Sequence, residues 1–227
     1  MKTVEPNIPR SDPGLLQEPW PRPVRAFRPE RVLKPRDWQP FVAPGGGPLD
    51  IEIGCGVGLH PLRYAREFPE RTLVAIEHTH SRFARFARRV ARHPVLPNLR
   101  PVQADAVAWV THSLGEASVD RYFFLYPNPY PKRGDLNRRW HAMPFMEKVI
   151  ATLKPGGTLL LATNQAFYAD EWARYLRGHW GLKERSARTL TREDAPRTHF
   201  EKKYLARGET CRELVFGKDL RRDLGSN

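Results

Sequence analysis

The chain has 227 residues, of which 40% are hydrophobic and 11% aromatic, which is enough for one α/β domain and too few for two full ones. Its 38 Lys and Arg against 25 Asp and Glu give a formal net charge of +13, which favours a polyanionic partner, although an arginine-rich proteome would give the same balance. Two distant cysteines, Cys55 and Cys211, indicate no disulfide framework, the apolar runs are too short for a membrane span, and no apolar leader is present, so we expect a cytoplasmic protein.

The first 48 residues are dense in proline and end in three consecutive glycines, Gly45 to Gly47. Proline removes backbone donors and blocks regular helix, so we expect an extended or partly disordered arm over residues 1–48, ahead of a domain over residues 49–227. The aromatic side chains of the arm can pack on the domain or contact RNA, and packing is the interpretation we favour. These side chains are Trp20, Phe27, Trp38 and Phe41.

From residue 49 the sequence alternates short apolar runs with longer amphipathic ones, a pattern typical of a doubly wound sheet. Strands are expected at Leu49–Ile53, Leu73–Ile76, Leu99–Gln103, Tyr122–Tyr126 and Thr158–Ala162. Helices are expected at His60–Phe68, Ser81–Arg92, Ala106–Leu114, Met143–Leu153 and Ala166–Trp180. Two further strands can follow at Leu182–Ser186 and Glu213–Phe216, joined by a polar stretch that contains residues 198–201.

The helix expected over residues 81–92 carries apolar side chains at helical spacing, and arginines fill the other positions. A stripe that faces the core, with a solvated basic face opposite to it, explains this pattern. Contact of the basic face with RNA is the alternative.

The first predicted strand runs into a glycine-rich turn ahead of a helix. Gly54, Gly56 and Gly58 allow the backbone to turn sharply and to approach a ligand where a side chain would collide. Glu77 ends the next strand, where a carboxylate can accept hydrogen bonds from both hydroxyls of a ribose. Asp105 follows the third strand and can accept from the exocyclic amine of an adenine. Together these residues predict a nucleoside site.

A dinucleotide-dependent dehydrogenase shares the glycine turn and the acidic strand end but needs a pyrophosphate site. Here Leu59 stands at the place of the third glycine in the dinucleotide pattern, and Glu52 puts a carboxylate close to the turn. A carboxylate suits the cationic methionine end of S-adenosylmethionine better than it suits phosphate. Charge complementarity therefore favours the methyl donor.

Over about residues 45–217 the chain resembles the tRNA (guanine-N7) methyltransferase family. Residues 52–58, Glu77 and the pair Asp105–Ala106 match features shared by class I methyltransferases. More specific is Tyr-Pro-Asn-Pro-Tyr-Pro-Lys-Arg at residues 126–133, which is similar to the family's Phe-Pro-Asp-Pro-Trp-x-Lys-Lys. Further matches are residues 137–139, Leu153–Gly157, Ala162–Asn164 and Thr198–Glu201. The resemblance implies a Rossmann-like α/β fold with a mostly parallel seven-stranded sheet and helices on both faces, S-adenosylmethionine as cofactor, and guanine N7 of a tRNA as target.

The resemblance also assigns site residues. Those that bind the cofactor are Glu52, Gly54, Gly56, Gly58, Glu77, Asp105, Ala106 and Asn128, and Asn128 is also the catalytic residue. Those that bind the substrate are Tyr130, Lys132, Arg133, Asn164, Thr198 and Glu201. We expect Tyr130 to stack on the base and the basic run of Lys132, Arg133, Arg138 and Arg139 to hold RNA phosphates, with a solvated loop as the alternative. Glu201 is expected to accept from the Watson–Crick edge of guanine, although Thr198 and Glu201 can also be ordinary loop residues.

Two amides, Asn128 and Asn164, stand where the family has acids. Attack by guanine N7 places positive charge on the base, which an aspartate would stabilise more than Asn128 does. For an exocyclic amine, the Asn128 amide oxygen and the Pro129 carbonyl can steer the nitrogen, and residues 128–130 partly resemble the Asn-Pro-Pro-aromatic motif of adenine-N6 methyltransferases. A divergent branch that acts on another base or RNA is therefore a second hypothesis.

Other classes of protein are weighed by the same residues. The three strand-end acids favour an active RNA methyltransferase, the two amides favour a catalytically silent RNA-binding protein, and the charge disfavours a small-molecule or protein substrate. Methyl transfer needs approach and orientation, so Cys55 is expected to be a small loop residue and not a nucleophile. His78 and His80 have a chelating spacing, but loop packing is preferred and no metal is expected. The oligomeric state stays open between monomer and homodimer.

Overall fold

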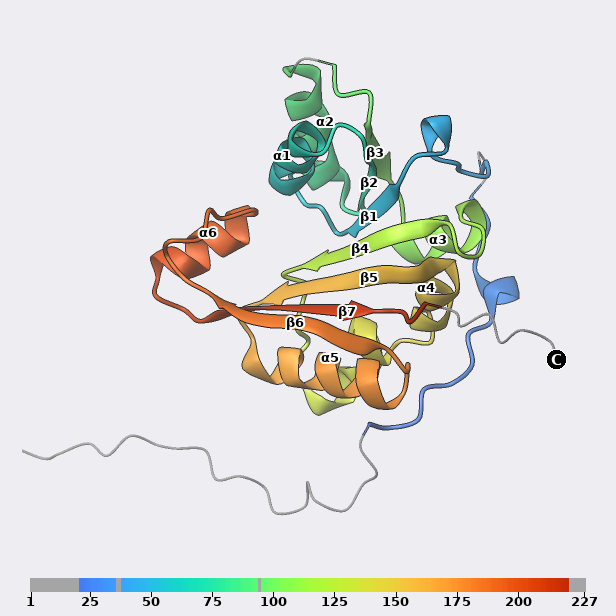
Figure 1. The fold of residues 1–227 in the computed structure, drawn as a ribbon, viewed down its shortest axis with the longest axis vertical. Helices are drawn as coiled ribbons and strands as arrows, with labels where there is room; N and C mark the ends of the chain where they lie inside the picture. Colours follow the sequence, from blue (N-terminus) through green and yellow to red (C-terminus); the bar gives the residue numbers. More distant parts are fainter. Residues whose placement is uncertain (1–20, 36–37, 94, 221–227) are drawn as a thin grey trace, which may run out of the picture.

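The computed structural model describes residues 21–35, 38–93 and 95–220. Within them lies a seven-stranded sheet of order β3-β2-β1-β4-β5-β7-β6 (Figure 1). The strands are β1 (Leu49–Ile53), β2 (Thr72–Glu77), β3 (Leu99–Gln103), β4 (Val119–Leu125), β5 (Leu153–Thr163), β6 (Lys183–Leu190) and β7 (Cys211–Gly217). Neighbouring strands are parallel except at β7, which runs antiparallel to β5 and β6. The expected Rossmann-like, mostly parallel sheet is confirmed.

Helices cover both faces of the sheet (Figure 1). They are α1 (Leu59–Glu67), α2 (His80–Ala91), α3 (Ala106–Ser113), α4 (Met146–Thr152), α5 (Ala166–Gly178) and α6 (His199–Ala206). On one face α3, α4 and α5 form a core with strand residues such as Ile51 and Phe124. On the other face α1 and α2 pack against residues such as Leu73 and Phe123. Since successive strand residues point to opposite faces, each central strand supplies both cores.

The predicted first and third strands have the bounds that the structure gives, whereas the fourth strand differs. It begins at Val119, three residues earlier than expected, and it ends at Leu125. Tyr126 does not extend it, because this residue has a φ of 53°, outside the β region. The helix expected over residues 143–153 is also shorter, since α4 starts at Met146 and Leu153 already pairs with Val119 as the first residue of β5.

Short helices occupy two stretches for which the sequence predicted none. The 3₁₀ helices η4 (Arg133–Arg138) and η5 (Trp140–Ala142) fold the basic run into compact turns. The polar stretch at residues 198–201 begins α6, with Thr198 as its N-cap. Thr198 Oγ1 accepts from the backbone N–H of Glu201 at 3.0 Å, which satisfies a donor that the first turn leaves unpaired. The alternative that Thr198 and Glu201 are ordinary loop residues is wrong, because they cap and begin a helix.

Described residues of the proline-rich arm pack on the domain. The Phe27 ring lies 6.0 Å from that of Phe145, and the Phe41 ring lies 5.7 Å from that of Trp109. Phe41 also donates its backbone N–H to the carbonyl of Ser113 at 2.8 Å. Packing is thus confirmed for Phe27 and Phe41, whereas Trp20 lies outside the described residues. The division into an arm over 1–48 and a domain over 49–227 stays a prediction.

Candidate functional site

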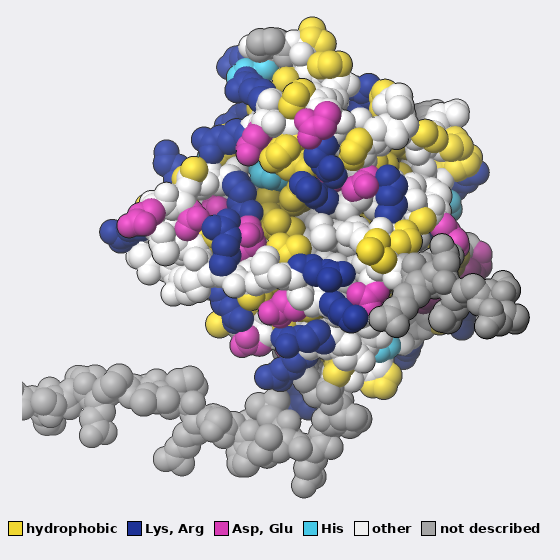
Figure 2. All heavy atoms as spheres, viewed as in Figure 1, with side chains coloured by type: hydrophobic (Ala, Val, Ile, Leu, Met, Phe, Trp, Pro, Cys, Tyr) yellow, Lys and Arg dark blue, Asp and Glu magenta, His cyan; other side chains and the backbone are white. Residues whose placement is uncertain are grey.

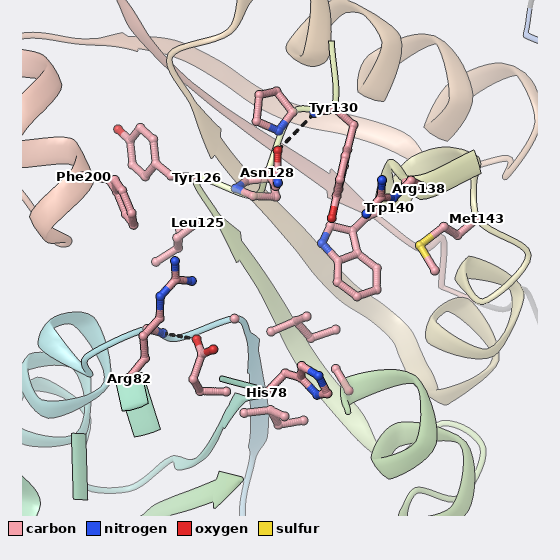
Figure 3. Close-up of a pocket in the computed structure, with 18 of the residues that line it drawn as sticks. His78, Arg82, Leu125, Tyr126, Asn128, Tyr130, Arg138, Trp140, Met143 and Phe200 are labelled. Atoms are coloured by element: carbon pink, nitrogen blue, oxygen red, sulfur yellow. Dashed lines mark hydrogen bonds between the residues drawn. The ribbon is translucent and has the colours of Figure 1, made fainter. Parts of the chain in front are cut away.

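A pocket of about 740 Å³ opens at the carboxyl edge of the parallel strands (Figure 3). The ends of β1, β2 and β4 and the segments that follow β3 and β5 supply much of its lining. Open α/β sheets bind ligands at this edge, and the volume lies toward the upper end of small-molecule sites. Of the predicted site residues, Gly54, Gly56, Glu77, Asp105, Ala106, Asn128, Tyr130 and Asn164 line the pocket, whereas Glu52, Gly58, Lys132, Arg133, Thr198 and Glu201 do not.

The glycine turn divides into two positions that face the pocket and one that packs. Gly54, Gly56 and Gly58 have φ values of 79°, 59° and 78°, a backbone region that residues with a Cβ rarely adopt. A Cβ added at Gly54 or Gly56 would meet no atom within 4 Å, so a ligand can approach this backbone. A Cβ at Gly58 would lie 1.9 Å from the Phe86 ring of α2. The structure therefore gives Gly58 a packing role in place of the predicted cofactor contact.

Glu77 ties the glycine turn to the end of β2. Its side chain is buried, Oε2 accepts from the N–H of Gly56 at 2.9 Å, and Oε1 accepts from the N–H of Thr79 at 2.7 Å. An ionised carboxylate has about four acceptor positions, so each oxygen can accept a further hydrogen bond from the pocket. Glu77 thus fixes the turn and presents an acceptor to a ligand.

Glu52 lies elsewhere than the sequence predicted. Residues of β1 alternate between the two faces, and Glu52 points toward α1, where its Oε2 lies 2.7 Å from His60 Nδ1. The side chain is 1% exposed, so it is enclosed between β1 and α1. The direct contact with a cofactor expected from its place beside the turn is therefore corrected to a buried pair with His60.

Asp105 caps α3 at the rim of the pocket. Its Oδ1 accepts from the backbone N–H of Val107 at 2.7 Å and from that of Ala108 at 3.4 Å. The side chain is exposed, and the positive end of the helix dipole favours its charge. Asp105 is thereby fixed in place with its second oxygen outside these two bonds. Ala106 follows as the buried first residue of the helix.

The segment after β4 has a strained backbone on both sides of Asn128. Tyr126 and Tyr130 have positive φ values of 53° and 44°, which cost about 1–3 kcal/mol each for residues with a Cβ. Between them stand two prolines around Asn128, whose Oδ1 accepts from the Tyr130 N–H at 3.3 Å. The resulting tight turn exposes Asn128 at the pocket (Figure 3).

A buried ion pair holds this turn in place. Arg139 is 4% exposed, and its Nη1 donates to Glu171 Oε1 at 2.6 Å. The other nitrogens of the guanidinium donate to the carbonyl of Tyr130 at 2.9 and 3.0 Å and to that of Lys132 at 3.1 Å. We call Arg139 and Glu171 the carbonyl clamp. The expectation that Arg139 holds RNA phosphates was wrong, because its donors are used inside the protein.

His141 is a second partner of Glu171 in the carbonyl clamp. Its Nε2 lies 3.2 Å from Glu171 Oε2, and the ring is fully buried. Burial lowers the pKa of His141, which the hydrogen bond to Glu171 offsets only in part. Burial by itself would raise the pKa of Glu171, but the hydrogen bonds from His141 and Arg139 outweigh it and lower that pKa. At neutral pH Glu171 is therefore ionised and its partner His141 is neutral.

The other members of the basic run remain at the surface. Lys132 and Arg133 are exposed and lie outside the pocket lining. The Arg138 guanidinium lies 4.2 Å from the centroid of the Tyr130 ring, a cation–π contact, and both residues line the pocket. The run therefore divides into exposed charges and one buried structural charge.

Asn164 and Thr198–Glu201 are held by internal contacts. Asn164 lines the pocket and donates from Nδ2 to Glu209 Oε2 at 2.7 Å. Glu201 is 1% exposed and forms an ion pair with Arg197 at 3.3 Å. The expected contact of Glu201 with a guanine edge is therefore not what the structure presents. Instead Glu201 and the Thr198 cap fix the start of α6.

Aromatic residues that the sequence did not assign to the site line two sides of the pocket. Figure 3 places Trp140 near Tyr130 on one side and Phe200 near Tyr126 on the other. The Tyr204 ring packs against both Tyr126 and Phe200, with centroids 5.6 and 6.2 Å apart. Phe200 is 46% exposed, unusual for a large apolar side chain. It lies within residues 198–201, but only the fold of α6 turns it toward the pocket.

Other chemistry expected from the sequence has these outcomes. Cys55 is buried, and burial, followed by the charges of Glu52 and Glu77, raises the pKa of its thiol well above the usual value, which disfavours a nucleophilic role. His78 lines the pocket and is exposed. Over residues 21–35, 38–93 and 95–220, no three His, Cys, Asp or Glu side chains form a metal-holding group. In the same ranges no helix has both the length and the apolar character that a membrane span requires.

The chain is similar in sequence and in fold to known methyltransferases. Residues 47–214 match the family model described as "Putative methyltransferase". The chain is 33% identical over 172 residues to a tRNA (guanine-N(7)-)-methyltransferase of Nitrosomonas eutropha, covering 75% of this chain and 76% of that one. Among solved structures, the 16S rRNA methyltransferase KamB aligns with a TM-score of 0.58 at 23% identity over 76% of this chain and 88% of that one. A 16S rRNA (adenine(1408)-N(1))-methyltransferase of Catenulisporales acidiphilia, solved with its cosubstrate S-adenosylmethionine, aligns with a TM-score of 0.56 at 18% identity, over 78% and 88%.

Proposed function

This chain belongs to the tRNA (guanine-N7)-methyltransferase family, and from that premise we propose that its pocket transfers a methyl group from S-adenosylmethionine to guanine N7 of a tRNA. The observation that carries the proposal is the convergence of three consecutive strand ends on one pocket. They supply an open glycine backbone, the buried carboxylate of Glu77 and the helix-capping carboxylate of Asp105. This set suits a nucleoside whose further substituent lies against the open glycine backbone.

The residues on this side of the pocket fit the cofactor. Gly54 and Gly56 leave room at their backbone, so we assign them to the amino-acid end. Glu77 retains acceptor capacity, and we assign it to the ribose hydroxyls, with Asp105 and Ala106 on the adenine. S-adenosylmethionine, when bound, supplies an electrophilic methyl carbon on a sulfonium. The Catenulisporales methyltransferase, which shares this fold, takes the same cosubstrate, and this supports the choice.

We assign Asn128 and Tyr130 to the target base. The guanine N7 lone pair attacks the methyl carbon, the N7–C bond forms as the S–C bond breaks, and no proton moves, so orientation is the main task. Positive charge develops on the base, and the Asn128 amide dipole faces it. Tyr130, held by the carbonyl clamp, presents its ring for stacking, with Asn164 nearby in the lining.

The remaining predicted substrate residues do not contact the target base in this proposal. Lys132 and Arg133, exposed beside the pocket, are assigned to RNA phosphates. Thr198 and Glu201 act indirectly, because they fix the start of α6 and so place Phe200. A tRNA substrate further implies that the protein acts in the cytoplasm.

A second candidate function rests on Asn128. Where the resembling family has an aspartate, this amide offers a weaker stabilisation of a cationic base, whereas its oxygen can accept from an exocyclic amine. A methyltransferase for another base, or a silent RNA-binding protein of the same fold, would keep the pocket geometry described above. The chemical identity of the product separates these functions.

The test is transfer of labelled methyl from S-adenosylmethionine to unmodified tRNA, followed by nucleoside mass spectrometry, with Asn128→Asp measured beside the natural protein. We expect 7-methylguanosine as the product. If the natural protein forms it at ordinary rates and Asn128→Asp adds nothing, the idea of a divergent branch is wrong. A different methylated nucleoside would overturn guanine N7 as the target, and cofactor binding without any product would support the silent binder.

A further inference from the structure

A shallow concavity of about 180 Å³ on the surface is lined by Arg85, Arg88 and Arg89 of α2 and by Arg92, the C-cap residue of this helix. We call this surface the arginine ridge. Arg85 and Arg92 stand seven residues, and so two helical turns, apart, with Arg88 and Arg89 between them. At 1.5 Å per residue the ridge extends about 10 Å along the helix. Four like charges therefore share one small face.

The arginine ridge has no acidic partner among the residues that the structure describes. Helix α2 contains no Asp or Glu, and in the part of the chain that the structure describes no carboxylate lies within 4.0 Å of these four guanidinium groups. Several arginines elsewhere do have acidic partners, such as Arg188 with Glu213, Arg212 with Asp170 and Arg177 with Glu184. Repulsion within the ridge is therefore left for an external anion to relieve.

The position of the ridge links it to the pocket. Helix α2 starts three residues after Glu77, and Arg82 in its first turn lines the pocket. Arg89 Nη1 lies 3.0 Å from Nε2 of His199, the first residue of α6, so α2 and α6 meet beside the pocket. In Figure 2 Lys and Arg side chains lie along the edge that α1, α2 and α6 form in Figure 1, with some Asp and Glu among them, and other Lys and Arg lie across the rest of this face. The ridge therefore lies where a polyanionic strand that leaves the pocket mouth would pass.

We propose that the arginine ridge of α2 binds the phosphate backbone of the RNA whose target base enters the pocket. The proposal rests on the proposed function for its partner, and it adds a second phosphate-binding surface to the exposed charges after β4. Guanidinium groups bind phosphate oxygens through paired N–H donors, and the ridge is long enough for about three successive phosphates of a strand. These contacts carry affinity and position without reading sequence.

The experiment compares two triple variants that remove equal charge. Arg85→Gln, Arg88→Gln and Arg92→Gln together remove three of the four charges of the ridge. They keep the contact of Arg89 with His199 of α6. Arg174→Gln, Arg177→Gln and Arg185→Gln form the matched control on α5 and β6, at the opposite end of the molecule in Figure 1. All six side chains are exposed, so folding is expected to persist, and thermal unfolding and S-adenosylhomocysteine affinity check this.

The primary readout is binding of fluorescent unmodified tRNA as a function of salt, which needs no methyl transfer. We expect the ridge variant to bind about tenfold or more weakly near physiological salt, with a salt dependence reduced by about two to three released counterions. The control variant should change affinity less than about threefold. For methyl transfer the ridge variant should raise KM for tRNA and leave kcat unchanged.

Equal effects of the two variants would overturn the proposal, because net charge alone would then explain RNA affinity. A loss of affinity for an acidic protein but not for tRNA would also overturn it. If the natural protein binds tRNA through the ridge but transfers no methyl group, the proposed function is wrong and the phosphate-binding role of the ridge is supported. If methyl transfer occurs with an unchanged KM in the ridge variant, the phosphate-binding role of the ridge is wrong and the proposed function is supported.

Discussion

The two sides of the pocket use their residues in opposite ways. The cofactor side, formed by Gly54, Gly56, Glu77 and residues 105–106, lines the pocket with open backbone and with carboxylates that keep acceptor capacity after their internal bonds are made, as at Glu77. The target side comprises residues 126–142, 164–171 and 197–213. Most of its buried charges pair with one another, as in Arg139 with Glu171 and Arg197 with Glu201. One side is a set of strand ends, and the other is an internally braced loop assembly.

The difference shows why a charged residue in a motif does not by itself identify a ligand contact. A charge that loses its hydration must find a partner inside the protein, since an isolated buried charge is very unfavourable. Arg139 and Glu201 are 4% and 1% exposed, and both have such partners. Many charges of the target side therefore position Asn128, Tyr130 and Phe200 and do not themselves contact a ligand.

The largest expected effect is on the carbonyl clamp. Arg139→Gln should lower the free energy of unfolding by about 3–5 kcal/mol, because it leaves the half-buried Glu171 without its cation and the carbonyls of Tyr130 and Lys132 without their donors. Arg138→Gln, at the exposed neighbour, should change that free energy by less than about 1 kcal/mol. Urea denaturation measures both. A similar small loss in the two variants would mean that the target side is not braced in this way.

A double variant sharpens the same comparison. Arg139→Met with Glu171→Met should recover much of the stability, since apolar replacements of a buried pair are often nearly neutral. Methyl transfer should not recover, because the carbonyls of Tyr130 and Lys132 lose their donors. Recovery of both stability and kcat would show that the clamp does not position the turn.

The next effect belongs to the cofactor side. Glu77→Ala should weaken S-adenosylmethionine binding about 10- to 100-fold, the equivalent of losing charged hydrogen bonds worth about 1.5–3 kcal/mol. Glu70→Gln, an exposed acid before β2, serves as the control and should bind normally. Isothermal titration calorimetry checks both. An unchanged affinity for Glu77→Ala would remove this residue from the cofactor site.

A smaller effect, on the order of 1 kcal/mol, should appear in the pH dependence of stability. Burial lowers the pKa of His141, so the unfolded chain takes up a proton near pH 6.5 before the folded chain does. The free energy of unfolding should therefore fall as the pH drops below about 6.5, and Glu171, whose pKa is also lowered, adds a further loss in more acidic solution. Urea titrations at pH 7.5 and 5.5 should show a flatter profile for His141→Asn, and an identical profile would contradict the buried neutral His141.

The smallest effect concerns the thiol beside the glycine turn. Burial raises the pKa of Cys55, so a thiol reagent should modify it slowly in the folded protein and rapidly in urea. Cys55→Ala should keep methyl transfer within about threefold, because no covalent step is required. Rapid modification of the native protein together with a large loss of kcat would mean that Cys55 takes part in the reaction.

The cofactor side was predictable because its residues lie next to one another in sequence and at strand ends. Apolar runs fixed the strands, and Gly54, Glu77 and Asp105 follow from where those strands stop. Within it, Glu52 and Gly58 were misassigned, since the alternation of β1 and the packing of Phe86 against the turn depend on which helices lie above the strand. The target side was harder to predict, because Glu171 contacts Arg139 from 32 residues away in the sequence and no local sequence pattern indicates that pair.

The sequence by itself determined the doubly wound class, the family and the strand-end residues, because hydrophobic periodicity and glycine turns are local properties of the chain. Only the tertiary structure decided which charges face a ligand and which face each other. Burial and ion pairing depend on distant segments meeting, as α6 does with α2 at Arg89 and His199. That is why Arg139 turned out to be internal while the arginines of α2, equally basic in sequence, stayed at the surface beside the pocket.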